Sequence, residues 1–234
     1  MNPSLHVFDT ADAWTQASTA YLANALLAAQ TERPWASLAL SGGSTPPPVY
    51  RALADDDRID WHRVRVYFCD DRCVPPDHEH SNARLAREHL IGPTGIPDDH
   101  VFQMDGTVDP EEAARQYDGL LREHFGGPPR FDAAVLGMGD DGHTCSLFPG
   151  SPALEEGKRL CLHTISPPGM VVRDRLTLTY PALAGCRHAL FLVKGESKRE
   201  PLREAFRGEN PAGRVALTDG DLRWHVDRAA APTD

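Results

Sequence analysis

The chain lacks the features that would place it in a membrane or outside the cell. None of its apolar stretches approaches the roughly 20 residues that a membrane-spanning helix needs. Residues 1–9 contain neither the basic segment nor the apolar segment of a signal peptide. We therefore expect a cytoplasmic protein without a membrane partner.

Cysteine and lysine are both scarce. Five cysteines are scattered along 234 residues, an odd number at a density too low for a disulfide scaffold. Lysine occurs only at 158, 194 and 198, and the formal net charge is −10. This charge argues against a partner such as nucleic acid or an anionic membrane surface. It does not exclude a small anionic substrate held by a few local cations, and we expect such a substrate. We also expect the protein to be a monomer.

Strand and helix patterns alternate along the chain. Short apolar or β-branched runs are separated by segments whose apolar residues recur at helical spacing, and no repeat or long linker interrupts them. This order predicts an α/β fold, a doubly wound, mainly parallel sheet flanked by helices in a Rossmann-like three-layer sandwich, within a single domain over 1–234. We expect strands at 35–40, 64–69, 101–104, 131–137, 160–165, 176–179, 188–193 and 222–226, and helices at 11–32, 47–53, 82–91, 110–125 and 198–206.

The segment 131–150 carries the most informative pattern. An apolar run at 133–136 leads into a Gly-Met-Gly turn at 137–139, after which come Asp141 and His143. Open α/β sheets bind ligands at the carboxyl ends of their strands, which is where this turn should lie. An imidazole two residues after a carboxylate is suited to be a general base with an orienting partner. The alternative is a solvated histidine in a polar turn.

A second glycine-rich turn, Ser-Gly-Gly-Ser-Thr-Pro at 41–46, follows another expected strand and precedes a helix. Gly42 and Gly43 allow successive N–H groups to converge, the hydroxyls of Ser44 and Thr45 add donors, and the helix N-terminus favours an anion. The turn therefore indicates a phosphate site. It lacks the Gly-Lys-Ser/Thr ending typical of nucleoside triphosphate loops. The alternative is a capped turn that binds nothing.

Charged side chains follow two further strands. Asp70, Asp71 and Arg72 come directly after the strand at 64–69, so they should share the same sheet edge. A carboxylate and a guanidinium there suit hydrogen bonds to sugar hydroxyls or to an oxyanion, with a surface salt bridge as the alternative. Lys198 begins a helix, from which its ammonium would reach a bound phosphate. The alternative for Lys198 is a solvated helix face.

The region after this strand also offers possible zinc ligands. Cys69 and Cys73 are followed by His78 and His80, and two thiols with two imidazoles form a suitable ligand set. Cys69, however, closes an apolar strand, which favours its packing as a small hydrophobic side chain. We therefore expect these residues to pack rather than to bind a metal.

Taken together, these motifs resemble those of the 6-phosphogluconolactonase family. The resemblance covers nearly the whole chain in the family's order, and the block at 137–150 is its most specific part. It implies a cytoplasmic hydrolase of the oxidative pentose phosphate pathway that opens 6-phosphoglucono-1,5-lactone without a metal or organic cofactor. The matching segments are Ser-Gly-Gly-Ser-Thr-Pro at 41–46, Asp-Asp-Arg-Cys-Val-Pro at 70–75, Ser-Asn at 81–82, Gly-Met-Gly-Asp-Asp-Gly-His-Thr-Cys-Ser-Leu-Phe-Pro-Gly at 137–150, Arg-Leu-Thr-Leu-Thr at 175–179, Gly-Glu-Ser-Lys at 195–198 and Trp-His-Val-Asp-Arg-Ala-Ala at 224–230.

The resemblance also implies roles for individual residues. His143 would be the general base that activates a water molecule, and Asp141 would hold its imidazole. Arg175, Lys198 or both would join the glycine turn around the phosphate, and Arg72 would position the sugar or the developing oxyanion. The implied catalytic residues are His143 and Asp141, and the implied substrate-binding residues are Gly42, Gly43, Ser44, Thr45, Asp70, Arg72, Arg175 and Lys198.

Two positions depart from the family's pattern. Asp71 stands where the family usually has Glu, and Cys145 where it usually has Ala. Neither departure alters His143. The role of Asp71 is therefore open.

Two other functions compete with lactone hydrolysis. The related glucosamine-6-phosphate isomerases/deaminases share the glycine turn and the Asp-Gly-His motif, but in them a Glu follows the histidine and a Tyr tends to replace Arg72. Here residues 144–148 contain no carboxylate. A sugar-phosphate-binding regulator without activity should have lost His143 or Asp141, and both are present.

Overall fold

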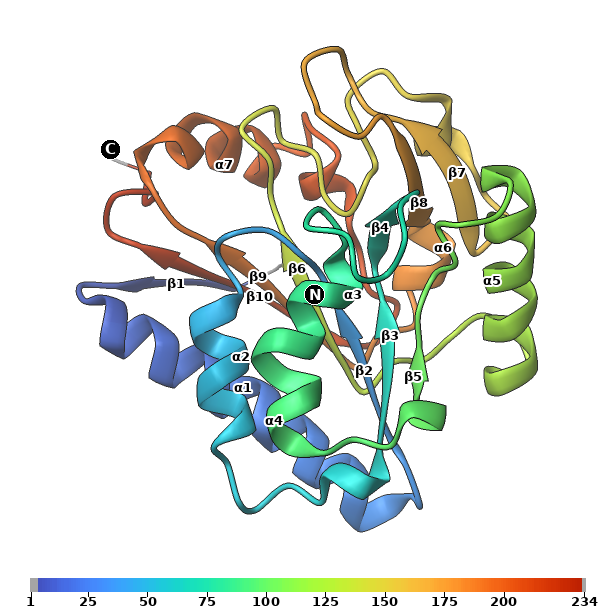
Figure 1. Ribbon diagram of the computed structural model, residues 1–234. Coiled ribbons are helices and arrows are strands. Elements are labelled where there is room, and N and C mark those ends of the chain that lie inside the picture. Colours follow the sequence, from blue (N-terminus) through green and yellow to red (C-terminus); the bar gives the residue numbers. More distant parts are fainter. Residues whose placement is uncertain (1–3, 233–234) are drawn as a thin grey trace.

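A computed structural model describes residues 4–232 and contains a seven-stranded parallel sheet at its centre. The strands lie in the order β1-β10-β9-β6-β2-β3-β5. The predicted fold class, a doubly wound sheet flanked by helices, is confirmed (Figure 1). The strands of this sheet are β1 (Ser4–Phe8), β2 (Ala36–Leu40), β3 (Val64–Phe68), β5 (Val101–Phe102), β6 (Ala133–Gly137), β9 (His188–Val193) and β10 (Asp221–Asp227).

The order of the sheet reverses between β2 and β6. From β2 the chain continues outward through β3 and β5, whereas β6 pairs with the other side of β2 and is followed by β9 and β10. A crevice forms at the carboxyl ends of the strands where such an order reverses. The turn at 41–46 leaves β2 at this point, and the turn at 137–143 leaves β6 beside it. The two glycine-rich turns therefore meet at the switch point of the sheet.

A second, antiparallel sheet was not predicted. It consists of β4 (Asp70–Arg72), β8 (Asp174–Leu178) and β7 (Cys161–Ile165), in that order. The strand expected at 64–69 therefore ends at Phe68, and the charged residues that follow pair with a strand about a hundred positions further on. Local patterning could not reveal this sheet because a three-residue strand depends on its partner for stability.

The helices follow the predicted pattern closely. Helix α1 packs along β2, β6, β9 and β10, and α5 lies beside β7 at the opposite side of the molecule (Figure 1). Capping side chains are present at two helix starts, since Asp109 accepts a hydrogen bond from Glu112 N–H and Ser81 accepts one from Arg84 N–H. The helices are α1 (Ala11–Glu32), α2 (Pro47–Ala54), α3 (Asn82–Ala86), α4 (Gly92–Thr94), α5 (Pro110–Phe125), α6 (Tyr180–Leu183) and α7 (Arg199–Phe206), with a π-helical turn (Arg87–Ile91) and short 3₁₀ turns at 61–63, 98–100, 152–155, 196–198 and 212–214.

Several details differ from expectation. Strand β1 was missed, because a five-residue strand at the sheet edge is established only by its pairing with β10. The expected helix at 82–91 is an α-helix that passes into a π-helical turn. The helix expected at 198–206 begins one residue later, at Arg199, after a 3₁₀ turn over 196–198.

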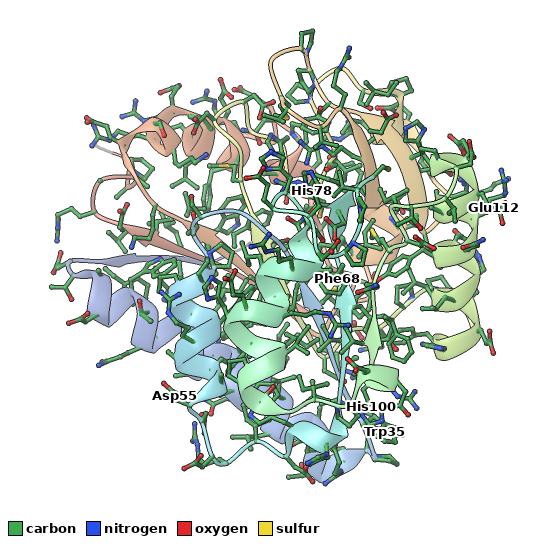
Figure 2. The ribbon with its side chains drawn as sticks, viewed as in Figure 1. Trp35, Asp55, Phe68, His78, His100 and Glu112 are labelled. Carbon is green, nitrogen blue, oxygen red and sulfur yellow. The ribbon has the colours of Figure 1, made fainter. Side chains whose placement is uncertain are left out.

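Labelled residues in Figure 2 mark the two ends of the sheet. Trp35 and His100 stack edge to face, with ring centroids 4.6 Å apart, before the first residues of β2 and β5 (Figure 2). His78 lies at the other end, beyond the last residues of β3 (Figure 2). Between residues 4 and 232, no helix has both the length and the apolar character required to cross a bilayer.

Candidate active site

A cavity of about 460 Å³ opens at the carboxyl ends of the central strands. Its walls come from the turn after β2, from β4, from the turn after β6, from the connection between β7 and β8, and from the loop after β9. The volume suits a small molecule. The cavity therefore coincides with the switch point at which an open α/β sheet binds its ligand.

His143 and Asp141 form a hydrogen-bonded pair at this cavity. His143 Nδ1 lies 2.5 Å from Asp141 Oδ1, and the backbone N–H of His143 donates to the same oxygen at 3.1 Å. Burial works against the charge of Asp141, but hydrogen bonding and attraction from His143 outweigh it, so the pKa of Asp141 is lowered. An ionised carboxylate accepts the proton of Nδ1, which leaves the lone pair of the imidazole on Nε2. His143 lines the cavity, whereas Asp141 lies behind it.

Gly139 makes room for this pair. A Cβ atom at position 139 would lie 2.1 Å from His143 Nδ1 and 2.6 Å from Asp141 Oδ1, far inside contact distance. The backbone N–H of Gly139 also donates to the carbonyl of His143 at 2.8 Å. The absence of a side chain at this position is therefore what allows the turn to close over the imidazole.

The glycine turn at 41–46 is fixed from two sides. The hydroxyl of Tyr50 donates to the Ser41 carbonyl at 2.7 Å and accepts from the Ser41 N–H at 3.2 Å. On the other side, a Cβ at Gly42 would lie 1.7 Å from Asn82 Oδ1, so only glycine permits this approach. Gly43 has a φ of +96°, which also favours glycine. The predicted residues Gly42, Gly43, Ser44 and Thr45 all line the cavity.

Two arginines face each other across the antiparallel sheet and line the same cavity. Arg72 of β4 and Arg175 of β8 are directly opposite in register. Burial and then the charge of Arg72 lower the pKa of Arg175, which is only 6% exposed. The Nε atoms of both arginines are buried and find no hydrogen-bond partner among residues 4–232. Since opposed like charges are unfavourable, this arrangement is suited to an anion.

The two neighbouring carboxylates have separate tasks. Asp70 lines the cavity and accepts hydrogen bonds from Ser146 Oγ at 2.7 Å and from Asn82 Nδ2 at 3.1 Å. Asp71 is turned away from the cavity and accepts the N–H groups of Asn82 at 2.7 Å and Ala83 at 3.0 Å. Burial raises the pKa of Asp71 to about 6. The role left open for Asp71 is therefore to hold the first turn of α3.

The loop between β9 and α7 contributes the remaining cations. Lys198 lines the cavity, and its Nζ lies 2.6 Å from Asp140 Oδ1, which holds the pKa of that carboxyl below its usual value. Lys194 lines the cavity as well and lies 4.8 Å from the centroid of the Trp14 ring. Sequence patterns pointed to Lys198 but not to Lys194.

The structure therefore gathers nine of the ten implied site residues on one cavity and places Asp141 directly behind His143. Sequence reasoning missed further polar residues there, among them Asn82, Ser146 and Lys194. Asn82 and Ser146 support Asp70, and the only signal for Asn82 was its place in a Ser-Asn helix start. Lys194 could have been found from its position one residue before the Gly195 turn.

The arrangement around the possible zinc ligands differs from a metal site. Cys69 is buried and its thiol donates to the Val135 carbonyl at 3.6 Å. Burial raises the pKa of the Cys73 thiol to about 11. Within 4–232, no three or more His, Cys, Asp or Glu side chains are grouped so as to hold a metal ion.

The fold and the cavity define a doubly wound α/β protein with a histidine–aspartate pair and two opposed arginines at its switch point. A family model described as glucosamine-6-phosphate isomerases/6-phosphogluconolactonase matches residues 9–224. The chain belongs to this family.

Individual relatives agree with this assignment. The chain is 40% identical over 209 residues to a 6-phosphogluconolactonase of Synechocystis sp., covering 85% of each protein. The crystal structure of 6-phosphogluconolactonase from Thermotoga maritima superposes with a TM-score of 0.87 at 28% identity, covering 97% of this chain and 100% of that one. A monomeric glucosamine-6-phosphate deaminase gives a TM-score of 0.83 at 20% identity, covering 97% of this chain and 98% of that one. The likeness to the deaminase concerns the fold alone.

Proposed function

We propose that the protein hydrolyses 6-phosphoglucono-1,5-lactone to 6-phosphogluconate, a reaction of the oxidative pentose phosphate pathway, with His143 as general base. Within its family, the protein belongs with the lactonases rather than with the isomerases. One observation carries the proposal for the site: the His143–Asp141 pair and the opposed arginines Arg72 and Arg175 line or adjoin a single cavity. A base and an anion-binding wall are the two elements that a phosphorylated lactone requires.

His143 begins the proposed reaction. Asp141 holds the proton on Nδ1, so Nε2 accepts a proton from a water molecule as the water oxygen attacks C1 of the lactone. A tetrahedral intermediate forms, and the bond between C1 and the ring oxygen then breaks. His143 returns its proton to the departing ring oxygen. The product carries a hydroxyl at C5 and a carboxylic acid at C1, which releases its proton to solvent and becomes the carboxylate.

The remaining cavity residues hold the substrate in this proposal. Arg175, Lys198 and the N–H and hydroxyl groups of the turn at 41–46 bind the 6-phosphate, because dianionic oxygens are best matched by charged donors and converging N–H groups. Arg72 positions the sugar or the oxyanion of the intermediate. Asp70 accepts hydrogen bonds from sugar hydroxyls.

We further propose that the protein works as a cytoplasmic monomer formed by a single domain, with the phosphosugar lactone as its partner and with no metal or organic cofactor. Deaminase chemistry is disfavoured because it must also move a proton between C1 and C2 and expel ammonia. Residues 144–148 provide no carboxylate for those steps. A regulator without activity is disfavoured because His143 and Asp141 are both retained and hydrogen-bonded.

The first prediction concerns the base. We expect His143→Ala to lower the enzymatic rate of lactone opening, measured after subtraction of the uncatalysed rate, at least about a hundredfold. This is the usual contribution of general-base catalysis. The matched control is His163→Ala, because His163 also pairs with a carboxylate, Asp174, at 2.8 Å but lies outside the cavity. It should retain the wild-type rate, and circular dichroism should show that both variants are folded.

The same proteins should be tested with glucosamine 6-phosphate. We expect no ammonia release from this amino sugar. A fully active His143→Ala variant would contradict the role of His143. Ammonia release above that of His143→Ala, without any acceleration of lactone opening, would replace the lactonase proposal with the deaminase alternative.

The second prediction concerns the phosphate. Arg175→Ala should raise KM for the phosphorylated lactone about tenfold to a hundredfold, because hydrogen bonds to charged groups contribute about 1.5–3 kcal/mol. Its effect on unphosphorylated gluconolactone should be small. Arg115→Ala is the control, because Arg115 is exposed, pairs with Glu112 on the surface of α5 and lies outside the cavity. Equal efficiency of the wild type on both lactones would exclude a phosphate site.

A further inference from the structure

Met170 lines the cavity but has no part in the mechanism above. Met170 belongs to the connection between β7 and β8, lines the cavity, and accepts a hydrogen bond at its Sδ from Arg175 Nη2 at 3.6 Å. A thioether sulfur is a weak acceptor. The Nε atom of Arg175 is buried and finds no partner among residues 4–232. Met170 therefore covers the guanidinium of Arg175 without satisfying it.

The connection holds Met170 in this position. Its base is closed by a hydrogen bond from the Ser166 N–H to the Arg173 carbonyl at 2.9 Å, and the Arg173 guanidinium returns to the Ser166 carbonyl at 3.2 and 3.3 Å. Its tip projects past the strands into solvent (Figure 1). Val171, the next residue, is 81% exposed, and Met170 itself is half-buried. The thioether is thus both fixed against Arg175 and open to small solutes.

The other methionines differ in accessibility. The chain has four, of which Met1 lies outside the described residues. Met104 is 4% exposed and Met138 is 7% exposed. Met138 also lines the cavity, but it lies within the turn after β6. Among residues 4–232, Met170 is therefore the methionine that a dissolved oxidant reaches most readily.

We propose that Met170 is a site of reversible oxidation that controls binding of the substrate phosphate to Arg175. The inference rests on the proposed function, in which Arg175 binds this phosphate. Hydrogen peroxide transfers one oxygen atom to the thioether: an S–O bond forms, the O–O bond breaks, the sulfur loses two electrons and the peroxide is reduced to water. The sulfoxide oxygen is a strong acceptor beside Arg175 Nη2. It pairs with the guanidinium and competes with the phosphate for it.

The test compares the protein before and after treatment with hydrogen peroxide. Peptide mass spectrometry should locate one added oxygen at Met170, and KM for the phosphorylated lactone should rise about tenfold, the effect of losing one charge-assisted hydrogen bond. The turnover number and the activity on unphosphorylated gluconolactone should stay unchanged. Methionine sulfoxide reductases for both epimers should restore KM, whereas dithiothreitol, which reverses cysteine oxidation, should not.

Two variants separate Met170 from the other oxidisable groups. Met170→Leu retains an apolar cover on Arg175 and should not respond to peroxide. Met138→Leu should respond as the wild type does, relative to its own untreated activity. An unmodified Met170, a modified Met170 with unchanged KM, or a response of Met170→Leu equal to that of the wild type would each overturn the inference. If the untreated wild type does not prefer the phosphorylated lactone, the phosphate site itself is wrong.

Discussion

At the scale of single residues, the candidate site depends on Gly139 having no side chain. Gly139 lies under the His143–Asp141 pair, and an added Cβ would overlap both polar atoms that form the hydrogen bond. Alanine at this position must therefore displace the imidazole or the carboxylate. Because a catalytic group displaced by about 1 Å commonly costs a hundredfold in rate, we expect Gly139→Ala to lose about that much activity.

The fold should survive this change, because the three atoms nearest to the added Cβ belong to side chains rather than to the backbone. Gly157→Ala is the control, since a Cβ at position 157 meets no atom within 4 Å and the residue is exposed and outside the cavity. Steady-state rates with lactone, together with thermal unfolding, measure both effects. Wild-type kinetics for Gly139→Ala would show that the pair observed here is not required for turnover.

At the scale of elements, the loop between β9 and α7 is held by the end of β10. The N–H of Gly195 donates to both carboxylate oxygens of Asp227, each at 3.1 Å, and Ala230 N–H donates to Asp227 Oδ1 at 2.8 Å. This loop carries Lys198 to the cavity. Asp227 is therefore a positioning residue that acts through the backbone of another element.

Asp227→Ala should raise KM for the phosphorylated lactone while the turnover number stays near the wild-type value. The reason is that the loop loses its anchor, whereas the turn that carries His143 is untouched. Unsatisfied N–H groups should also lower the free energy of unfolding by about 1–3 kcal/mol. Asp219→Ala, which breaks only an exposed ion pair with Arg130, should change neither quantity. A fall in turnover number without a change in KM would contradict this role.

At the scale of the whole molecule, a buried histidine links stability to pH. His225 of β10 is 3% exposed and packs against the rings of His6 and Phe8. Its Nδ1 atom lies 3.0 Å from Ser18 Oγ of α1. Burial, and then the charge of His6, lower the pKa of His225 from 6.5 to about 4. The folded protein therefore binds this proton less readily than the unfolded chain does.

The sign of the effect follows from proton binding. Between pH 4 and 6.5 the unfolded chain carries more of this proton, so stability rises with pH and is lost as pH falls through this range. The expected contribution is about 2 kcal/mol, less than the full shift implies, since His225 also lines a groove that is open to solvent. The raised pKa of Asp71 gives a slope of opposite sign over much of the same range.

A variant therefore has to isolate the contribution of His225. The free energy of unfolding in urea should be measured at a series of pH values. His225→Gln should be less stable than the wild type near pH 7, and the difference between the two free energies should shrink by about 2 kcal/mol toward pH 4. His62→Gln, an exposed histidine, should follow the wild type throughout. Parallel curves for His225→Gln would show that the proton of His225 is not linked to folding.

The chain's own pattern determined most of the parallel sheet and its helices. Runs such as 133–136 are apolar because a central parallel strand is buried on both faces, and helix α5 begins at a capping aspartate that can be recognised locally. The glycine-rich turns and the Asp-Gly-His motif were equally readable, because their chemistry depends on residues adjacent in the chain.

Tertiary structure alone decided the rest. Arg72 lies opposite Arg175 only because β4 pairs with β8, and no local pattern specifies a pairing across that separation. Asn82, Lys194 and Met170 reach the cavity from three different elements. Local preferences follow from the backbone and the nearest neighbours, whereas a cavity wall of opposed arginines from distant segments exists only once the chain has packed and its buried charges have been brought together.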